Sequence, residues 1–316
     1  MTIPSHRNLI LIAVFVCALI APTRSDAITF DRVVVFGASI SDPGNAFALT
    51  GEAIKPPYDE LDAFLVPDAP YARGGHHFSN GATWIERYAK PHGLGKYVGA
   101  AFADGHSRAL NYAVGGARAR NDGINVNFTD QLAALLTDVS NVAPSDALYV
   151  IDLGANDVRD ALAAGDPTIL ADALNSIAAN LGTLYAVGAR KFLVLNAPNL
   201  AVLPSIRILD GIFPGAAFAA GALSQAFNAN LDAVIAFIAA LPGVEIAQVN
   251  LFQLVNTIMA DPAAFGLTEA ETPCITPNVA PFTCKKPDQY FFWDGIHPTK
   301  AVHGILAQEA AAVLDQ

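Results

Sequence analysis

The chain has 316 residues, enough for one large domain or two small ones with a sizeable core. It carries 18 Lys and Arg against 29 Asp and Glu, a formal charge of −11, which excludes the basic footprint of a nucleic-acid-binding protein and disfavours anionic lipid surfaces. Hydrophobic residues make up 53% and charged residues 15%, which excludes a disordered chain. We therefore predict a compact globular protein rich in loops.

Residues 1–27 have the pattern of a secretory signal peptide. An uninterrupted apolar run covers residues 9–21, which is shorter than the roughly 20 residues that a membrane-spanning helix needs. A small-x-small cleavage pattern then ends at Ala27. The alternative is an uncleaved anchor, which Pro22 after the short run disfavours. We expect cleavage after residue 27, export from the cytoplasm, and a single domain over residues 28–316 with no integral membrane segment.

Export to an oxidising compartment would favour a disulfide between the cysteines that remain. Cys17 leaves with the signal peptide, so Cys274 and Cys284 remain, ten residues apart. In an oxidising compartment the simplest interpretation is one disulfide, which would stabilise so short a loop by about 2–3 kcal/mol. A metal site is the alternative, but two thiols without a nearby His cannot complete a tetrahedral shell. We predict the disulfide, no metal and no cofactor.

Strand-like and helix-like segments alternate along the chain. Short apolar runs with the composition of buried parallel strands cover residues 32–36, 147–153, 191–195 and 244–249. Longer Ala-rich segments of helical length cover residues 169–187, 217–241 and 299–314. This alternation predicts an α/β fold, a three-layer α/β/α sandwich with a central, mostly parallel sheet. Residues 52–97 are dense in Pro, Gly and aromatic side chains and are predicted to form mostly an elaborated loop.

Four short polar segments lie at or beyond the carboxyl ends of predicted strands, the edge where open α/β sheets bind ligands. The first, FGASISDPGN, covers residues 36–45. Ser39 lies two residues past the strand, where the N-terminus of a following helix would present its hydroxyl and a free backbone N–H. A Ser at such a place is, by itself, more typical of a helix N-cap.

The second and third segments each supply a hydrogen-bond donor. In NYAVGGA, residues 111–117, paired glycines let a backbone amide approach a ligand or simply make a tight turn. In GAND, residues 154–157, the amide of Asn156 can donate into a site or form an Asx-turn at the start of a helix. Taken singly, both segments favour the structural alternative.

The fourth segment, FWDGIHPT at residues 292–299, pairs a carboxylate with an imidazole. Asp294 and His297 are three residues apart, which brings both side chains to one side of a tight turn. A carboxylate beside an imidazole fixes its tautomer and stabilises its protonated form, as a serine nucleophile requires. The alternative is a surface Asp–His pair, which the adjacent disulfide loop makes less attractive.

Together and in this order, the four segments resemble the four blocks of the GDSL, or SGNH, family of hydrolases, over residues 32–300. The motifs SDPGN after Ser39, FSNGATW at 78–84 and FFWDGIHPT at 291–299 are similar to the secreted lipolytic branch. One position departs from the family pattern. The first block usually reads Gly-Asp-Ser-Leu, whereas this chain has Ala38 in place of the Asp.

The resemblance implies a role for each site residue. Ser39 would be the nucleophile, His297 the general base and then acid, and Asp294 the carboxylate that orients it. The oxyanion hole would consist of the backbone N–H groups of Ser39 and Gly116 with the side-chain amide of Asn156. The implied fold is the three-layer, flavodoxin-like SGNH sandwich.

The implied function is that of a secreted serine esterase, which hydrolyses short acyl or lysophospholipid-like esters through an acyl-enzyme. Its partner would be a small-molecule or lipid ester. A carbohydrate acetylesterase, an acyltransferase on the same fold, and a binding protein with weakened catalysis are the alternatives, the last favoured by Ala38 alone. The sequence assigns no role to Asp152, and a glycosylation sequon at Asn127 matters only in a eukaryotic host. Four loop histidines are predicted to be solvated rather than metal ligands: His76, His77, His92 and His106.

Overall fold

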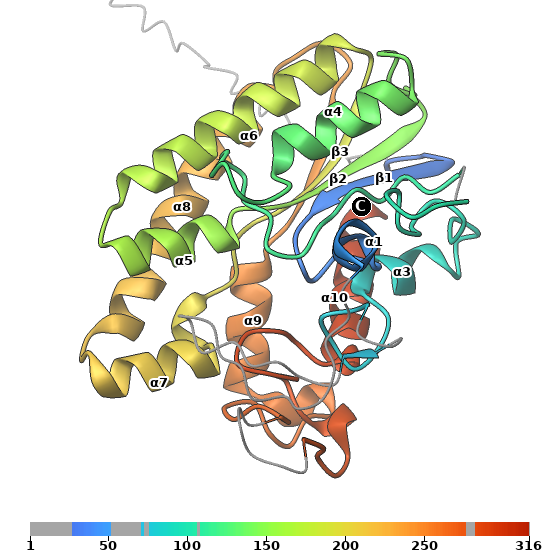
Figure 1. Cartoon of the computed structure of the whole chain (residues 1–316). Helices are drawn as coiled ribbons and strands as arrows, with labels where there is room; N and C mark the ends of the chain where they lie inside the picture. Colours follow the sequence, from blue (N-terminus) through green and yellow to red (C-terminus); the bar gives the residue numbers. More distant parts are fainter. Residues whose placement is uncertain (1–26, 52–70, 73–75, 106–107, 276–281, 316) are drawn as a thin grey trace, which may run out of the picture.

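The computed structural model describes residues 27–51, 71–72, 76–105, 108–275 and 282–315. At its centre, four parallel strands pair in the order β1-β2-β3-β4 (Figure 1). These strands are β1 (Arg32–Gly37), β2 (Ala147–Asp152), β3 (Lys191–Leu195) and β4 (Glu245–Val249). All four runs predicted as strands are confirmed, with ends within a residue of the prediction.

The burial of a strand depends on what covers its faces and its edges. All six residues of β2 are buried, because a central strand has neighbours on both edges and helices over both faces. β4, at the end of the order, has one buried residue, Val249. β1, at the other end of the order, has five buried residues, because residues 110–114 bond to its free edge.

Helices cover both faces of the sheet. Their bounds in chain order are α1 (Asn45–Thr50), α3 (Trp84–Ala89), α4 (Phe128–Asp138), α5 (Ala155–Ala164), α6 (Thr168–Ala186), α7 (Pro204–Ile212), α8 (Ala216–Ala239), α9 (Leu251–Ala260) and α10 (Lys300–Leu314). α4, α6 and α8 pack side by side in one layer, whereas α3 packs on α10 in the other (Figure 1). The predicted three-layer α/β/α sandwich is confirmed, and so are the three long helices, with ends shifted by at most two residues.

The prediction missed the shorter helices. α3 lies inside the segment predicted as mostly loop, although a capping box in which Thr83 and Glu86 satisfy each other's backbone N–H groups marks its start. Six residues are too few to show a hydrophobic period. Residues 52–70 and 73–75 of that segment lie outside the described residues, as do residues 1–26 of the expected signal peptide.

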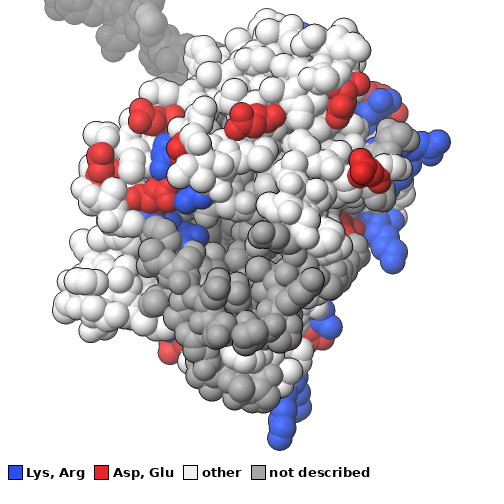
Figure 2. Space-filling model, in the orientation of Figure 1, with Lys and Arg blue, Asp and Glu red and all other residues white. Residues whose placement is uncertain are grey.

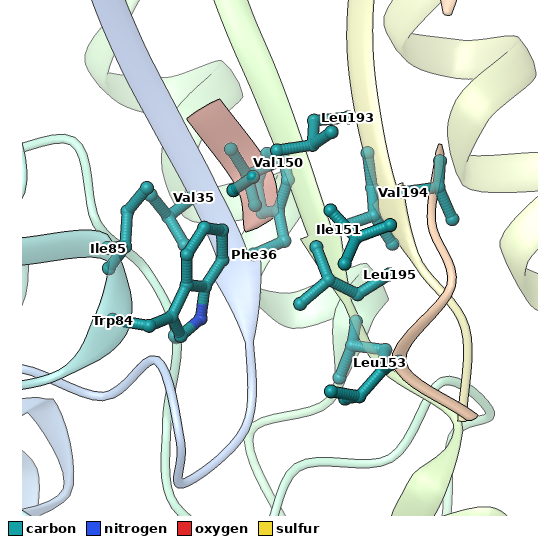
Figure 3. Close-up of a cluster of buried hydrophobic side chains, with 14 of the residues drawn as sticks. Val35, Phe36, Trp84, Ile85, Val150, Ile151, Leu153, Leu193, Val194 and Leu195 are labelled. Atoms are coloured by element: carbon teal, nitrogen blue, oxygen red, sulfur yellow. The ribbon is translucent and has the colours of Figure 1, made fainter. Parts of the chain in front are cut away.

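The core between β1 and α3 also supports the edge of the sheet that carries the polar segments. Trp84 and Ile85 of α3 lie against Val35 and Phe36 at the end of β1 (Figure 3). All four side chains are fully buried. Burying one such side chain contributes about 1.5–3 kcal/mol, so this contact fixes α3 against the end of β1.

α8 is the one described helix that is long and apolar enough to cross a bilayer, judged by length and composition alone. In the fold it packs against α5, α6 and α7, and 28% of its most apolar window is buried. Phe218 and Phe237 remain exposed on it. Ser, Gln, Asn and Asp interrupt its apolar sequence.

Candidate active site

Ser39 lies in a tight turn that directly follows β1. The Ser41 N–H donates to the Ala38 carbonyl at 3.0 Å and the Asp42 N–H to the Ser39 carbonyl at 3.4 Å. The expectation that a helix begins at Ser39 is wrong, because α1 starts only at Asn45. The Asp42 carboxylate, not the Ser39 hydroxyl, accepts the backbone N–H groups at the start of that helix.

The structure brings Ser39, His297 and Asp294 into one hydrogen-bonded chain. The Nε2 atom of His297 lies 2.9 Å from the Ser39 Oγ, across 258 residues of sequence. The Nδ1 atom of the same ring lies 2.7 Å from the Asp294 Oδ2. A carboxylate at Nδ1 leaves Nε2 free to accept the serine proton, which is the geometry of an activated nucleophile.

The Asp294 carboxylate is fully buried and has four hydrogen-bond donors. Its Oδ1 accepts the backbone N–H groups of Ile296 at 2.8 Å and His297 at 2.7 Å. Its Oδ2 accepts the Tyr71 hydroxyl at 2.6 Å beside the imidazole. Burial acts to raise the pKa of Asp294, but the His297 charge and the hydrogen bonds outweigh it, so the pKa lies below its ordinary value. The carboxylate is therefore ionised when His297 needs it.

The predicted disulfide supports the segment that carries Asp294 and His297. Cys274 and Cys284 are bonded, with Cα atoms 5.4 Å apart. The backbone N–H of Cys274 donates to Phe292 at 2.9 Å, and that of Ile275 donates to Trp293 at 2.8 Å. These two hydrogen bonds hold the residues immediately before Asp294.

The FSNG motif holds the same segment from its other side. The Ser79 hydroxyl donates to the Pro298 carbonyl at 2.8 Å, and the Asn80 side-chain Oδ1 accepts the Lys300 backbone N–H at 2.7 Å. Gly81 lies so close to Lys300 that an added Cβ would be 2.7 Å from the lysine Cβ. The backbone after His297 is thus clamped to residues 79–81.

Phe78, the first residue of the motif, packs beside His297 with ring centroids 5.5 Å apart. A Cβ on Gly115 would lie 2.3 Å from the Phe78 ring, so only glycine allows this contact. Gly115 therefore shapes the wall beside the imidazole. The backbone N–H of Gly115 already has an acceptor, since it donates to Asp42 Oδ2 at 2.8 Å.

The neighbouring Gly116 differs from Gly115 in having a free amide. Its φ of +82° lies in the region that glycine favours. Among the described residues, the backbone N–H groups of Ser39 and Gly116 have no hydrogen-bond acceptor. Both amides are therefore available to a developing oxyanion.

Asn156 stands in the first turn of α5 and is tied to the Gly116 turn. Its side-chain amide donates to the Ala117 carbonyl at 2.8 Å, which leaves a second N–H for a ligand. Arg118 also binds Asp160 of α5 through Nε at 3.0 Å and Nη2 at 2.9 Å. These contacts belong to a mixed group of basic and acidic side chains around α5 (Figure 2).

Ser39, His297 and Asn156 line one cavity of about 80 Å³ at the carboxyl edge of the sheet. A second cavity of about 70 Å³ shares four lining residues with the first: Ile40, Pro198, Leu203 and Ile296. Most of its lining side chains are apolar, among them those of α9 and α10. Gly116 does not line either cavity. The candidate site therefore combines polar groups at its centre with an apolar extension.

The chain matches the model of the GDSL-like lipase/acylhydrolase family over residues 33–310. It belongs to this family. A GDSL esterase/lipase of Arabidopsis thaliana, At4g30140, is 28% identical over 96% of this chain and 92% of its own length. A second, At1g23500, is 31% identical over 53% of this chain, and the chain spans about half (50%) of that relative. Among solved structures, the LAE5 hydrolase from a Lake Arreo metagenome has a TM-score of 0.47 at 15% identity, covering 90% of this chain and 95% of its own.

In this GDSL-family hydrolase, sequence reasoning missed two contributors to the site. Tyr71 stood among the loop aromatics without a role, although its hydroxyl reaches Asp294. Asp152 lines the cavity with Ser39 and accepts the Ser41 hydroxyl at 2.6 Å. In the sequence, Tyr71 is marked only by the preceding proline, and Asp152 only by its place at the end of an apolar strand. Neither signal shows which residue the side chain would contact.

One other sequence expectation also needs correction. His77 is not solvated: it is buried, and its Nε2 lies 2.8 Å from Glu86. The side-chain amide of Asn127 in the sequon is buried, where it accepts the Arg118 N–H and donates to Asp122. His106 lies outside the described residues. In the part of the chain that the structure describes, no three His, Cys, Asp or Glu side chains gather as a metal site would require.

Proposed function

We propose that this GDSL-family hydrolase is a secreted serine esterase that cleaves carboxylic esters through an acyl-enzyme. The observation that carries the proposal is the hydrogen-bonded chain from Asp294 through His297 to Ser39. A buried, ionised carboxylate, an oriented imidazole and a partly accessible hydroxyl have the order that nucleophilic acyl transfer needs.

The steps follow from these contacts. The Ser39 Oγ attacks the ester carbonyl while His297 Nε2 takes its proton. His297 then gives this proton to the leaving alcohol, and the ester bond breaks to leave an acyl group on Ser39. Water, deprotonated by the same imidazole, attacks the acyl-enzyme, and the proton returns to Ser39 as the acid leaves. Asp294 stays ionised and stabilises the imidazolium at both stages.

The developing oxyanion would be held by the N–H groups of Ser39 and Gly116 and by the Asn156 amide. The free amides and the second Asn156 N–H support this assignment. Loss of one such donor typically costs about 10²–10³-fold in rate. Asn156→Ala therefore tests the oxyanion hole separately from the nucleophile.

The apolar cavity beside Ser39 supports a substrate with a short acyl chain, of a simple or lysophospholipid-like ester. Burying each methylene there contributes about 0.8 kcal/mol. A carbohydrate acetylesterase and an acyltransferase use the same catalytic groups. Rates on acyl esters of increasing length, on acetylated xylan, and with an added alcohol acceptor distinguish these three activities.

The decisive experiment is Ser39→Ala, assayed on a short acyl ester and with a fluorophosphonate probe. We expect no labelling and no hydrolysis above background, with an unchanged circular dichroism spectrum. Ser145→Ala, which removes an exposed hydroxyl before β2, is the matched control and should label like the wild type. Full activity in a folded Ser39→Ala protein would refute the proposal. Export is tested separately, by sequencing the N-terminus of the secreted chain, which should begin at Ile28.

A further inference from the structure

We propose that Asp152, acting through the hydroxyl of Ser41, holds the turn that presents Ser39, and so controls the turnover of the ester hydrolysis proposed above. This inference rests on that proposed function. Asp152 itself does not bond to Ser39, so its role is that of a positioning residue.

A directed chain of hydrogen bonds joins three elements at this point. The Trp84 Nε1–H of α3 donates to the Ser41 Oγ at 2.8 Å, and the Ser41 hydroxyl donates to the Asp152 Oδ2 at 2.6 Å. A hydroxyl has one proton to give. Because Trp84 can only donate, the ionised carboxylate of Asp152 is what gives the Ser41 proton a fixed direction.

Ser41 transmits this constraint to the nucleophile. It lies two residues after Ser39, and its N–H closes the turn on the Ala38 carbonyl at 3.0 Å. Its carbonyl accepts the Asn111 amide at 2.9 Å. The Ala38 side chain supplies no polar group to the turn. The Ser41 side chain is therefore the link between the Ser39 turn and the rigid end of β2.

The backbone is shaped to permit this contact. Gly37, the last residue of β1, is paired with Asp152 in the sheet. A Cβ at position 37 would lie 3.1 Å from the Ser41 Cβ and 3.3 Å from the Asp152 Cβ. Glycine thus lets the carboxylate and the hydroxyl meet behind the nucleophile.

Burial disfavours the charged form of Asp152. Burial raises its pKa to about 6, and the hydrogen bonds from Ser41 and Trp84 offset only part of that rise. The other ionisable groups that line the same cavity are Arg159 and His297. A group kept for packing alone would stabilise the protein, so activity and stability should respond to its replacement in opposite directions.

The experiment compares Asp152→Asn with the wild-type full chain at pH 8 on a short acyl ester. Asn keeps an acceptor for Ser41 but lacks the charge that orients its proton. We expect kcat to fall about ten- to a hundred-fold with KM nearly unchanged, the size of effect that misplacing a reacting group produces. The Tm at pH 8 should rise by about 2–4 °C, because a buried charge has been removed.

Ser41→Ala removes the same hydrogen bond by deleting its donor. It should lower kcat to a similar extent. The kcat of the double variant should be no lower than that of the worse single variant, because both substitutions remove the same Ser41–Asp152 hydrogen bond. Tyr149→Phe is the matched control. Tyr149 lies on the same strand, three residues before Asp152, and the substitution removes its partly buried hydrogen bond to the Pro144 carbonyl. It should lower Tm and leave kcat unchanged.

An unchanged kcat in Asp152→Asn, or a Tm that falls as kcat falls, overturns this inference. So does a double variant whose losses multiply. These outcomes are distinct from failure of the proposed function, which Ser39→Ala tests alone: an inactive Ser39→Ala with a fully active Asp152→Asn removes only the role assigned to Asp152.

Discussion

The Oδ2 atom of Asp294 is shared between the His297 imidazole and the Tyr71 hydroxyl, at 2.7 Å and 2.6 Å. With two backbone N–H groups on Oδ1, the carboxylate has a donor for nearly every lone pair. Its geometry is thereby fixed before a substrate arrives. A sequence shows the Asp–His spacing but not the tyrosine, which is 223 residues away in the chain.

At this scale the first prediction concerns Tyr71→Phe. Loss of a hydrogen bond to a charged group costs about 1.5–3 kcal/mol, so we expect kcat to fall at least about tenfold. The pKa of Asp294 should move back toward its ordinary value, because one of the hydrogen bonds that lower it is gone. Steady-state kinetics on a short acyl ester check this. A variant with wild-type kcat would show that the hydroxyl is dispensable.

Asp152 and Asp157 give a second prediction, about the pH dependence of stability. Burial raises the pKa of each from 3.8 to about 6. A carboxyl with a raised pKa contributes stability that is complete below pH 3.8 and is lost as pH rises through about 6. We expect these two groups to make the free energy of unfolding larger at pH 5 than at pH 8, by about 1–3 kcal/mol each. Urea unfolding at both pH values measures this, and Asp152→Asn should reduce the difference.

Among the elements, α5 shows most clearly how one backbone conformation positions a site residue. Gly154 precedes the helix with φ +115°, which directs Asn156 into the cavity. A Cβ there would lie 2.2 Å from the Phe227 ring of α8. The Gly-x-Asn-Asp motif was identifiable in the sequence. Its glycine is required by two packed helices, which the sequence does not reveal.

Gly154→Ala should therefore destabilise the protein by about 2–5 kcal/mol, from backbone strain and overpacking together. Gly182→Ala in α6 is the control, since nothing lies within 4 Å of its added Cβ, and it should be neutral or stabilise by up to about 1 kcal/mol. Denaturant unfolding of both variants tests the pair. Equal stability of the two would contradict the packing argument.

The disulfide loop gives a further prediction at the scale of an element. Replacing both Cys274 and Cys284 with Ala should lower the free energy of unfolding by about 2–3 kcal/mol, as expected for a loop this short. Activity should fall as well, because residues 274 and 275 bond the backbone just before Asp294. Thermal unfolding and ester hydrolysis of the double variant measure the two effects. A loss of stability with full activity would mean that other contacts suffice to hold the segment.

For the whole molecule, composition and pattern predicted the layers but not the fine structure of the site edge. Long helices and β-branched runs were recognisable because their signal is summed over many residues. α1, α3 and the Ser39 turn depend instead on single side chains such as Asp42 and Thr83, which accept backbone N–H groups. The family motifs gave the positions of the site residues, while the contacts that hold those motifs together, such as Ser79 with Pro298, required the structure.

The long separation between Ser39 and His297 has a consequence for synthesis. The two residues are 258 positions apart, so at about 5–20 residues per second a ribosome completes Ser39 roughly 10 to 50 seconds before the imidazole exists. During that interval the nascent chain carries an ordinary, unreactive hydroxyl. The Ser39–His297 pair can therefore form only after almost the whole polypeptide has been made.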